Sequence, residues 1–423
     1  MRVVILGNGV TGISAALRLR QLQPDWRIQV VSGESTHHYS RPALMYVFMG
    51  HMRYQDTKPF PDQFWKEQRI ELVRDWVTGI DTSARRLECA GAEAIDYDHL
   101  LIATGSRSNR FGWPGQDLAG VQGLYGLQDL KLLHDNMTGC ARAVIVGGGL
   151  IGIELAEMLL SRGVAVTFLV RESSYWNNVL PAEESEMINR LIRSHRIDLQ
   201  LLTELKSIGD DGGGRVTHVI TGTGERIDCQ LVGLTAGVSP NLGALAGSGI
   251  ETGRGVLVDR SMRTSAPGVL AAGDCAEIKS EDGGRNLLQQ VWYTGKMQGE
   301  LAAQTIAGRE VRYDEGTWFN SAKFFDLEYQ VYGDVNRDRP GERSHYWEHP
   351  DGDRALRIVT IEDRVIGINL MGIRFRHEVC EAWIREQRTL DHVLERLGDA
   401  AFDPEFHRFH ALEIAGAMAE RLS

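Results

Sequence analysis

Two short glycine-rich segments hold the residues whose types and spacing are most suggestive of chemistry. Both follow the pattern G-x-G-x-x-G, with glycines at Gly7, Gly9 and Gly12 and again at Gly147, Gly149 and Gly152. In this pattern the first glycine permits a tight turn, the second lets the backbone approach a pyrophosphate, and the third packs a helix closely on a strand. The free N–H groups at the start of that helix attract an anion. Each segment therefore predicts a phosphate-binding turn.

The residues around each turn have the pattern of a strand followed by a helix. Residues 4–13 and 144–153 align at a constant offset of 140 residues, and six of the ten aligned positions are identical. An apolar β-branched run precedes each turn, and apolar residues at helical spacing follow it. The two positions between the second and third glycines are filled by Val10 and Thr11 in one copy and by Leu150 and Ile151 in the other. The chain is thus predicted to hold two βαβ units that each bind a dinucleotide.

The residue that ends the second strand of each unit indicates which nucleotide binds there. Glu34 follows the run 27–32, and a carboxylate at this point can accept hydrogen bonds from ribose hydroxyls. In the second unit the run 164–170 ends at Arg171, whose guanidinium can pair with a 2′-phosphate. The adjacent Glu172 argues against such a phosphate, and a solvated Arg171 at a strand end is the alternative. The choice between NADH and NADPH stays open.

Length and composition indicate a folded globular protein of more than one domain. A length of 423 residues predicts two to three domains at about 150 residues each. The 46 Lys and Arg against 57 Asp and Glu give a net charge of −11, so nucleic acid is not an expected partner. The N-terminus leaves no room for a signal peptide before Gly7, and no apolar run is free enough of charges and glycines to span a membrane. We therefore expect a cytoplasmic location.

The spacing of cysteines and histidines argues against several kinds of site. The five cysteines, Cys89, Cys140, Cys229, Cys275 and Cys380, include no C-x-x-C or C-x-x-x-x-C pair. Such scatter argues against a disulfide framework, a thiolate metal site and a vicinal redox pair, and it is typical of a reducing compartment. His407 and His410 have a spacing compatible with one helical face, but the sequence shows no third ligand beside them. No metal site is expected there, nor at His195 or His377.

Four further segments complete a family pattern. They are S-R-P-A-L at 40–44, L-I-A-T-G-S at 101–106, G-V-S-P-N at 237–241, and G-V-L-V-D followed by G-V-L-A-A-G-D-C-A within 255–276. With these motifs and the two turns, the chain resembles the pyridine nucleotide-disulfide oxidoreductase superfamily, nearest its rubredoxin, ferredoxin and nitrite reductase branch. The resemblance covers about residues 1–333.

The resemblance implies an α/β fold with two Rossmann-like dinucleotide-binding domains and a C-terminal α+β domain. An FAD-binding domain would comprise residues 1–113 and 243–312, with an NAD(P)H-binding domain of residues 114–242 inserted between its two parts. Residues 313–423 would form an interface or dimerisation domain, in which a pattern of strands is followed by helix-like stretches.

The resemblance also assigns cofactor contacts to individual residues in the two turns and the shared motifs. These residues are Gly7, Gly9, Val10, Thr11, Gly12, Glu34, Arg41, Pro42, Thr104, Gly105, Gly147, Gly149, Leu150, Ile151, Gly152, Arg171, Gly237, Gly273 and Asp274. Asp274 is expected to bind the ribityl chain of the flavin. Hydride transfer needs the nicotinamide held about 3–3.5 Å from the flavin, which two facing nucleotide folds can supply.

The sequence departs from the family at several points near the flavin. Residues 40–50 contain no cysteine, so disulfide exchange with a flavin-side thiolate is not expected. Glu154 matches a family position that pairs with a lysine, but Tyr46 replaces that lysine, which leaves Lys58 or the nicotinamide amide as partners. Trp292 either lines an electron exit or packs in the core. Cys275, beside the flavin motif, is expected to be a small packed residue.

These observations predict an FAD-dependent NAD(P)H oxidoreductase. The nicotinamide would pass a hydride to FAD, and electrons would then go singly to a small redox protein, either rubredoxin or a ferredoxin-like iron–sulfur protein. Glu154 and Trp292 are the candidate catalytic residues. One alternative is an NADH:quinone reductase at a membrane surface, and another is a flavin-holding redox sensor or electron-transfer subunit. The family resemblance also suggests a homodimer.

Overall fold

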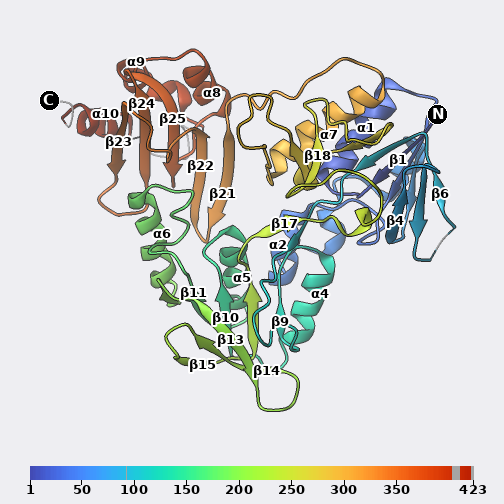
Figure 1. Cartoon of the computed structure of the whole chain (residues 1–423). Coiled ribbons are helices and arrows are strands. Elements are labelled where there is room, and N and C mark those ends of the chain that lie inside the picture. Colours follow the sequence, from blue (N-terminus) through green and yellow to red (C-terminus); the bar gives the residue numbers. More distant parts are fainter. Residues whose placement is uncertain (92, 403–409, 421–423) are drawn as a thin grey trace. The chain divides into compact units, whose positions relative to one another are not determined.

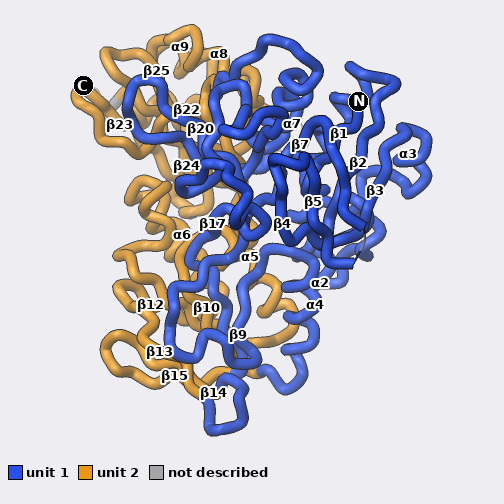
Figure 2. The backbone as a smooth tube through the Cα atoms, turned by 45° about the vertical axis from the view of Figure 1, so that its right-hand side comes forward, with its two compact units in different colours: residues 1–140, 210–216, 230–314 blue, residues 141–209, 217–229, 315–423 orange. Residues whose placement is uncertain are grey.

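The computed structural model of the chain describes residues 1–91, 93–402 and 410–420 (Figure 1). The chain divides into two compact units, unit 1 of residues 1–140, 210–216 and 230–314, and unit 2 of residues 141–209, 217–229 and 315–423 (Figure 2). Each unit combines helices with sheets, which confirms the predicted α/β class. The division into FAD-binding, NAD(P)H-binding and C-terminal domains stays a prediction.

Unit 1 is built on a parallel five-stranded sheet. Its strands lie in the order β19 (Val269–Ala271), β7 (His99–Ile102), β1 (Arg2–Leu6), β2 (Arg27–Val31) and β3 (Ile70–Val73). Helix α1 (Val10–Leu22) connects β1 to β2, as the first glycine-rich turn predicts. Strand β1 is a nearly continuous apolar run because a parallel strand is covered on both faces.

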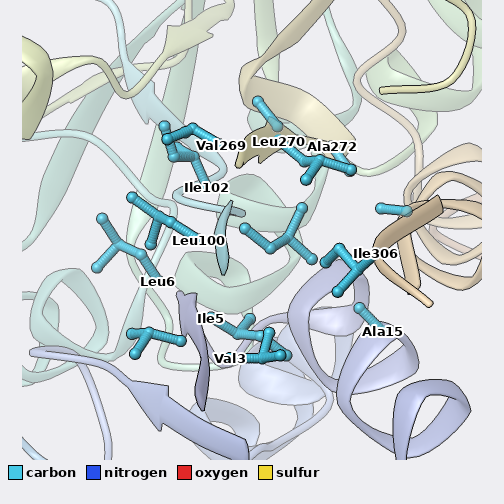
Figure 3. Packing of buried hydrophobic residues seen from close by; sticks show 14 of the residues in the cluster. Val3, Ile5, Leu6, Ala15, Leu100, Ile102, Val269, Leu270, Ala272 and Ile306 are labelled. Carbon is cyan, nitrogen blue, oxygen red and sulfur yellow. The ribbon is translucent and has the colours of Figure 1, made fainter. Parts of the chain in front are cut away.

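The core of unit 1 joins this sheet to helices α1 and α7 (Trp292–Ile306) (Figure 3). Apolar side chains from β1, β7 and β19 pack with Ala15 of α1 and Ile306 of α7. The two helices approach closely at Gly299, where a Cβ atom would lie 2.3 Å from the carbonyl oxygen of Thr11. Only glycine permits this contact, which holds α7 against the start of α1.

Shorter elements complete unit 1. The strands are β4 (Val77–Asp81), β5 (Arg86–Cys89), β6 (Ile95–Asp96), β8 (Ser106–Ser108), β9 (Val121–Gln122), β16 (Leu231–Leu234), β17 (Val238–Pro240), β18 (Val256–Val258) and β20 (Ala276–Ile278). The helices are α2 (Leu44–Met49), α3 (Asp62–Glu67) and α4 (Leu127–Asn136), with 3-10 turns η1 (Arg41–Ala43), η2 (Tyr54–Thr57), η3 (Gly243–Leu245) and η4 (Gly273–Cys275). Strand β8 pairs antiparallel with β17, so the segments around the A-T-G and G-x-x-P-N motifs lie side by side.

Unit 2 begins with the second predicted βαβ element. Strands β10 (Arg142–Val146), β11 (Ala165–Leu169) and β12 (Asp198–Gln200) are parallel neighbours, and α5 (Leu150–Leu160) connects β10 to β11. Helix α6 (Ala182–Ser194) follows, and then β13 (Leu205–Asp210), β14 (Val216–Thr221) and β15 (Arg226–Asp228) form a small sheet. The repeat found in the sequence is therefore a structural repeat of strand, glycine turn and helix.

The remainder of unit 2 is an antiparallel sheet with helices. Its strands lie in the order β21 (Phe319–Phe324), β22 (Leu327–Gly333), β25 (Arg364–Met371), β24 (Ala355–Ile361) and β23 (Glu342–Glu348). Helices α8 (His377–Arg385), α9 (Leu390–Glu395) and α10 (Ala411–Glu420), with the 3-10 turn η5 (Leu397–Ala400), contribute to its hydrophobic core. Strands followed by helices agree with the sequence pattern beyond residue 313.

A buried ion pair connects this sheet to helix α6. Arg357 on β24 donates to both carboxylate oxygens of Glu184, at 2.8 and 2.7 Å, and Asn369 donates to Glu184 at 3.0 Å. The side chains of Arg357 and Glu184 are only 5% and 1% exposed. Burial alone would lower the pKa of Arg357, but the two neighbouring glutamates Glu183 and Glu184 raise it above its ordinary value. The C-terminal sheet and α6 are thus held together by paired charges.

Candidate functional site

The first glycine turn has two glycines that the protein itself requires and one that it does not. Gly7 has φ +116°, and a Cβ atom there would lie 2.1 Å from the carbonyl oxygen of Ala103. A Cβ atom at Gly12 would lie 2.0 Å from the carbonyl oxygen of Gly7. Gly9, in contrast, has φ −67°, and a Cβ atom there would meet no protein atom within 4 Å. The open space at Gly9 fits a pyrophosphate that approaches the backbone.

The second turn repeats this arrangement in unit 2. Gly147 has φ +121°, whereas Gly149 has φ −133° and open space within 4 Å of its Cβ position. The hydroxyl of Tyr175 donates to the carbonyl oxygen of Gly149 at 2.8 Å, and this hydrogen bond helps to fix the conformation of the turn. A dinucleotide phosphate fits here for the same reason as in unit 1.

Both turns lead into helices whose N-terminal N–H groups lack side-chain caps. Gly9 and Gly149 are the N-cap residues of α1 and α5, and neither helix has an acidic residue in its first turn. The next residues, Val10 and Thr11 or Leu150 and Ile151, supply the first N–H groups of each helix. Such N–H groups and the helix dipole attract an anion. The residues predicted from the sequence to hold phosphates are brought together in each turn.

Glu34 lies just beyond β2, where the sequence predicts a ribose contact. Its carboxylate accepts hydrogen bonds from Arg41, at 3.0 Å to Oε1 and 2.7 Å to Oε2, from the N–H of Leu127 at 2.9 Å, and from the hydroxyl of Tyr39. Burial alone would raise the pKa of Glu34, but the Arg41 guanidinium and these donors hold it below its ordinary value. Three donors share Oε1, which leaves lone-pair capacity on Oε2 for a ribose hydroxyl.

Arg41 is itself fixed by neighbours on two segments. It precedes Pro42 in the turn η1, it donates to the carbonyl oxygen of Tyr125 at 2.8 Å, and its guanidinium lies 4.5 Å from the centre of the Tyr125 ring. The ion pair with Glu34 and the cation–π contact together define its orientation. This predicted cofactor residue therefore bridges the acidic ribose position and an aromatic residue that the sequence analysis did not single out.

Asp274, the residue expected to bind the ribityl chain, lies at the other end of the same hydrogen-bonded group. Its carboxylate accepts from the hydroxyls of Ser106 at 3.1 Å and Tyr125 at 3.3 Å. Gln290 donates to the Ser106 hydroxyl at 2.7 Å, and the N–H of Ser106 donates to the Tyr125 hydroxyl at 2.8 Å. Burial raises the pKa of Asp274 despite these donors. A polyol hydroxyl suits this carboxylate, because a further hydrogen-bond donor would offset the cost of burying its charge.

Glycines bring Asp274 to the first turn. Gly273 has φ +78°, and a Cβ atom there would lie 2.3 Å from the Thr11 hydroxyl oxygen, so the turn η4 packs directly on the start of α1. Gly105 and Gly237 also have positive φ, at +68° and +83°. The Thr104 hydroxyl donates to the carbonyl oxygen of Asn241 at 2.7 Å, which connects the motif at 101–106 to the motif at 237–241. The predicted FAD residues of unit 1 are therefore assembled from distant parts of the chain.

Sequence reasoning missed four members of this group. Ser106 lies in the recognised motif at 101–106, and Gln290 lies two residues before the candidate Trp292, so their positions carried a usable signal. Tyr125 had no such signal, since it lies in no motif and its role depends on the tertiary fold. Tyr39, which precedes the S-R-P-A-L segment and donates to Glu34, is the fourth.

Arg171 lies just beyond β11, and it forms an ion pair with its neighbour. Its Nε and Nη2 donate to Glu172 at 3.1 and 2.8 Å, and its side chain is 73% exposed. Side-chain hydrogen bonding to Glu172 raises the pKa of Arg171. Both properties anticipated from the sequence are present, since the guanidinium lies in the solvent and an acidic group competes for it.

Glu154 lies one helical turn from a second carboxylate on α5. Burial and the nearby Glu157 raise the pKa of Glu154 from 4.5 to about 7. Glu157 pairs at 3.5 Å with Lys323 on β21, and no described residue donates a hydrogen bond to the carboxylate of Glu154. Lys58, suggested from the sequence as a partner of Glu154, pairs with Asp62 at 2.6 Å. Glu154 is thus a carboxyl group that can hold a proton near neutral pH.

Trp292, Cys275 and the histidines have distinct surroundings. Trp292 begins α7 and is 46% exposed, which excludes the core alternative, whereas Cys275 is fully buried as expected. The rings of His195 and His377 pack against Phe325 and Phe319, at 4.1 and 4.3 Å between centroids. His407 lies outside the described residues. His410 does have ligand-type neighbours, His349 and Glu413, that the sequence did not reveal.

Comparisons with known proteins point to one family of reductases. The family described as "Pyridine nucleotide-disulphide oxidoreductase" matches residues 1–299. Rhodocoxin reductase of Rhodococcus erythropolis is 31% identical over 327 residues, 77% of this chain and 76% of the relative. The ferredoxin--NAD(+) reductase subunit of the benzene 1,2-dioxygenase system of Pseudomonas putida is 31% identical over 310 residues, 73% of this chain and 75% of the relative.

Solved structures show the same fold. The ferredoxin reductase for the CYP199A2 system from Rhodopseudomonas palustris superimposes with a TM-score of 0.81, at 26% identity and over 99% of both chains. A NAD-dependent persulfide reductase from A. fulgidus superimposes with a TM-score of 0.86, at 23% identity, over 100% of this chain and 84% of that one. Both superpositions cover nearly all of this chain and so extend beyond the family match, which ends at residue 299.

The open space at Gly9 predicts that a single methyl group there blocks FAD without harming the fold. Alanine adopts φ −67° readily and meets no protein atom at this position, so the free energy of unfolding without cofactor should change by less than about 0.5 kcal/mol. We expect Gly9→Ala to raise the Kd for FAD at least tenfold, measured by fluorescence titration of the cofactor-free protein. Gly149→Ala is the matched control, since it should weaken nicotinamide binding and leave the FAD affinity unchanged. Wild-type FAD affinity in Gly9→Ala would contradict the assignment of this turn.

The raised pKa of Glu154 predicts a pH-dependent gain in stability on its replacement. Because the native carboxyl keeps its proton up to about pH 7 and an ordinary one loses it near 4.5, the native state loses stability between these values as the pH rises. Glu154→Gln removes this loss, so urea unfolding should show a gain of about 1–3 kcal/mol at pH 8 and little change at pH 4.5. Glu395→Gln on the exposed side of α9 should change neither. A gain of equal size at both pH values would show that Glu154 is not the titrating group.

Proposed function

Because the chain belongs to the pyridine nucleotide-disulphide oxidoreductase family, we propose that it is an FAD-dependent NAD(P)H oxidoreductase that passes electrons to a small redox protein of the rubredoxin or ferredoxin type. The observation that carries this proposal is the pair of glycine turns with open space at Gly9 and Gly149. Each turn fits one dinucleotide, and a reductase of this kind needs two, one for the flavin and one for the nicotinamide.

The residues of this chain bind and orient the two cofactors. FAD, when bound, accepts a hydride and can release electrons one at a time. The turn at Gly9 and the N-terminus of α1 hold its pyrophosphate, Glu34 accepts from its adenosine ribose, and Asp274 accepts from its ribityl chain. In unit 2 the turn at Gly149 holds the pyrophosphate of the nicotinamide donor. Glu154 supplies a carboxyl group that is partly protonated near neutral pH, beside the turn that binds the donor.

The absence of cysteine from residues 40–50 favours an electron-transfer protein over a disulfide substrate as the acceptor. These residues form η1, α2 and the chain before η2, where Arg41 and Pro42 are predicted to contact FAD. Without a thiolate in this segment, the chain lacks the group that would attack a disulfide substrate. A one-electron protein acceptor needs no such group.

An exposed face on α7 is our proposed site of electron exit. Trp292 and Met297 are 46% and 38% exposed, and Lys296 is exposed between them. Exposed aromatic and Met side chains with a single positive charge suit docking of a small acidic protein. Gly299, two turns further along α7, packs on Thr11 of α1, which fixes the helix relative to the FAD turn within unit 1.

The protein acceptor is favoured over a membrane quinone. Among the described residues no helix is both long and apolar enough to cross a bilayer. Helix α10, near the C-terminus, carries two glutamates and neither Lys nor Arg, unlike the basic helices that lie on anionic membranes. We propose a cytoplasmic location, consistent with the free thiols of Cys89, Cys275 and Cys380, and, from the family resemblance, a homodimer.

The proposed function predicts two separable steps in rapid kinetics. Anaerobic stopped-flow with NADH should show fast bleaching of the bound flavin, followed by reoxidation on mixing with rubredoxin or a [2Fe–2S] ferredoxin. Trp292→Ala should slow reoxidation by the protein acceptor about tenfold, which corresponds to about 1.4 kcal/mol, and leave bleaching by NADH unchanged. Phe111→Ala, at another exposed aromatic side chain, is the control and should slow neither step. Slow bleaching by both nicotinamides would instead support a sensor or electron-transfer subunit.

The ion pair between Arg171 and Glu172 predicts a preference for NADH that one substitution can relax. Glu172 occupies the guanidinium and repels a 2′-phosphate, so the wild type should have a lower KM for NADH than for NADPH. Glu172→Gln should lower the KM for NADPH about three- to tenfold and hardly change the KM for NADH. Adding Arg171→Ala should abolish this gain in steady-state assays. A KM for NADPH that is the same in all three proteins would exclude a 2′-phosphate site at Arg171.

A further inference from the structure

A second group of chemically active side chains lies in the C-terminal part of unit 2. His349 directly follows β23, in the turn H-P-D-G-D-R that leads to β24, and His410 directly precedes α10. Glu413 lies on the first turn of α10. None of these residues belongs to the cofactor sites, so the group is independent of the proposed redox function.

The three side chains have the spacing of metal ligands. One ring nitrogen of His349, one ring nitrogen of His410 and one carboxylate oxygen of Glu413 all lie within 4.8 Å of one another. His349 forms a second group of the same kind with Asp351 and Asp353. Two histidines and a carboxylate are a ligand set that zinc prefers in proteins. Two segments about sixty residues apart in the chain thus converge on one point.

Two carboxylates lie close to the ring of His349. The N–H of Asp351 donates to His349 Nδ1 at 3.2 Å, so in the neutral ring this nitrogen carries a lone pair rather than a proton. Carboxylate oxygens of Asp351 and Asp353 lie 3.4 and 3.9 Å from the same nitrogen, and Arg354 lies 3.4 Å from the Asp353 carboxylate. The negative charge of these two exposed carboxylates favours a cation at the rim of the group.

His410 and Glu413 already converge on one point. Nδ1 of His410 lies 2.7 Å from Glu413 Oε2, a spacing that a proton can bridge, or that two ligands of one metal ion can have once that proton has left. The residue is only 5% exposed, and its ring packs at 5.8 Å against Trp347 and at 4.9 Å against His349. The imidazole therefore has little freedom, so little conformational entropy is lost when a ligand binds.

We propose that His349, His410 and Glu413 form a binding site for a divalent metal ion of the zinc type, with Asp351 and Asp353 adding negative charge at its rim. The ion ties the β23–β24 turn to the first turn of α10. Its role is structural, because it connects a helix to the sheet of the C-terminal region.

The test uses the purified full-length protein without a histidine tag, dialysed against a chelator and checked for retained secondary structure by circular dichroism. We expect it to bind one equivalent of Co²⁺ with the visible absorbance of a nitrogen- and oxygen-coordinated ion, and Zn²⁺ should displace the Co²⁺. Micromolar Zn²⁺ should also raise the Tm of unfolding. Elemental analysis of the protein before dialysis measures which ion it carries.

Two variants and one control keep the outcome decisive. His349→Ala and Glu413→Gln should each weaken Co²⁺ binding at least tenfold, and Glu413→Gln keeps the shape of the side chain if His349→Ala unfolds. His392→Ala, on α9 in the same region, should bind as the wild type does. The proposal is overturned if the wild type binds no stoichiometric metal or if both variants retain its affinity. A Tm that does not respond to Zn²⁺ would also contradict the proposal.

Discussion

The architecture of unit 1 depends on backbone approaches that leave no room for side chains. Positions 7, 12, 273 and 299 would each place a Cβ atom within 2.3 Å of an atom in a neighbouring segment, and those segments are the end of β7, the first turn itself and the start of α1. These contacts draw β1, β7, α1, α7 and η4 towards one point. Dispersion attraction stabilises such close approaches, because the energy of each contact between atoms is small but many contacts form together. The anion site arises at the same point, since Gly9 alone among the turn's glycines faces open space.

The polar groups at this point are paired before any ligand arrives. Glu34 and Arg41 form a partly buried ion pair, and Tyr125 links Arg41 to Asp274 through a ring contact and a hydroxyl. Such a pair offers little net stability, since desolvation offsets much of the attraction. Its value here is orientation, because each partner restricts the rotamers of the next. A ligand that adds donors to Glu34 and Asp274 then meets acceptors that are already fixed.

The sequence predicted the parts of this site that obey local rules. The glycine turns, their flanking strands and helices, Glu34 and Asp274 follow from spacing and motif, because strand, turn and helix are formed by neighbouring residues. Tyr125, the N–H of Leu127 and the pairing of Lys323 with Glu157 escaped prediction. Each of these contacts joins segments more than ninety residues apart in the chain. The periodicity of a sequence does not predict contacts over such distances. The exposure of Trp292 escaped for the same reason, since an aromatic at a helix start is buried or exposed according to what packs beside it.

Charge balance joins the C-terminal sheet of unit 2 to the helices of its βαβ region. The family match ends at residue 299, yet Lys323 and Arg357 lie beyond it and pair with Glu157 and Glu184 within it. Removing one partner of a buried ion pair costs several kcal/mol, because the remaining charge stays away from water. Glu184 is therefore tolerable inside the protein only while β24 supplies Arg357. Lys323 pairs in the same way with Glu157 on α5, at 3.5 Å. The C-terminal sheet thus supplies cations to carboxylates on both α5 and α6.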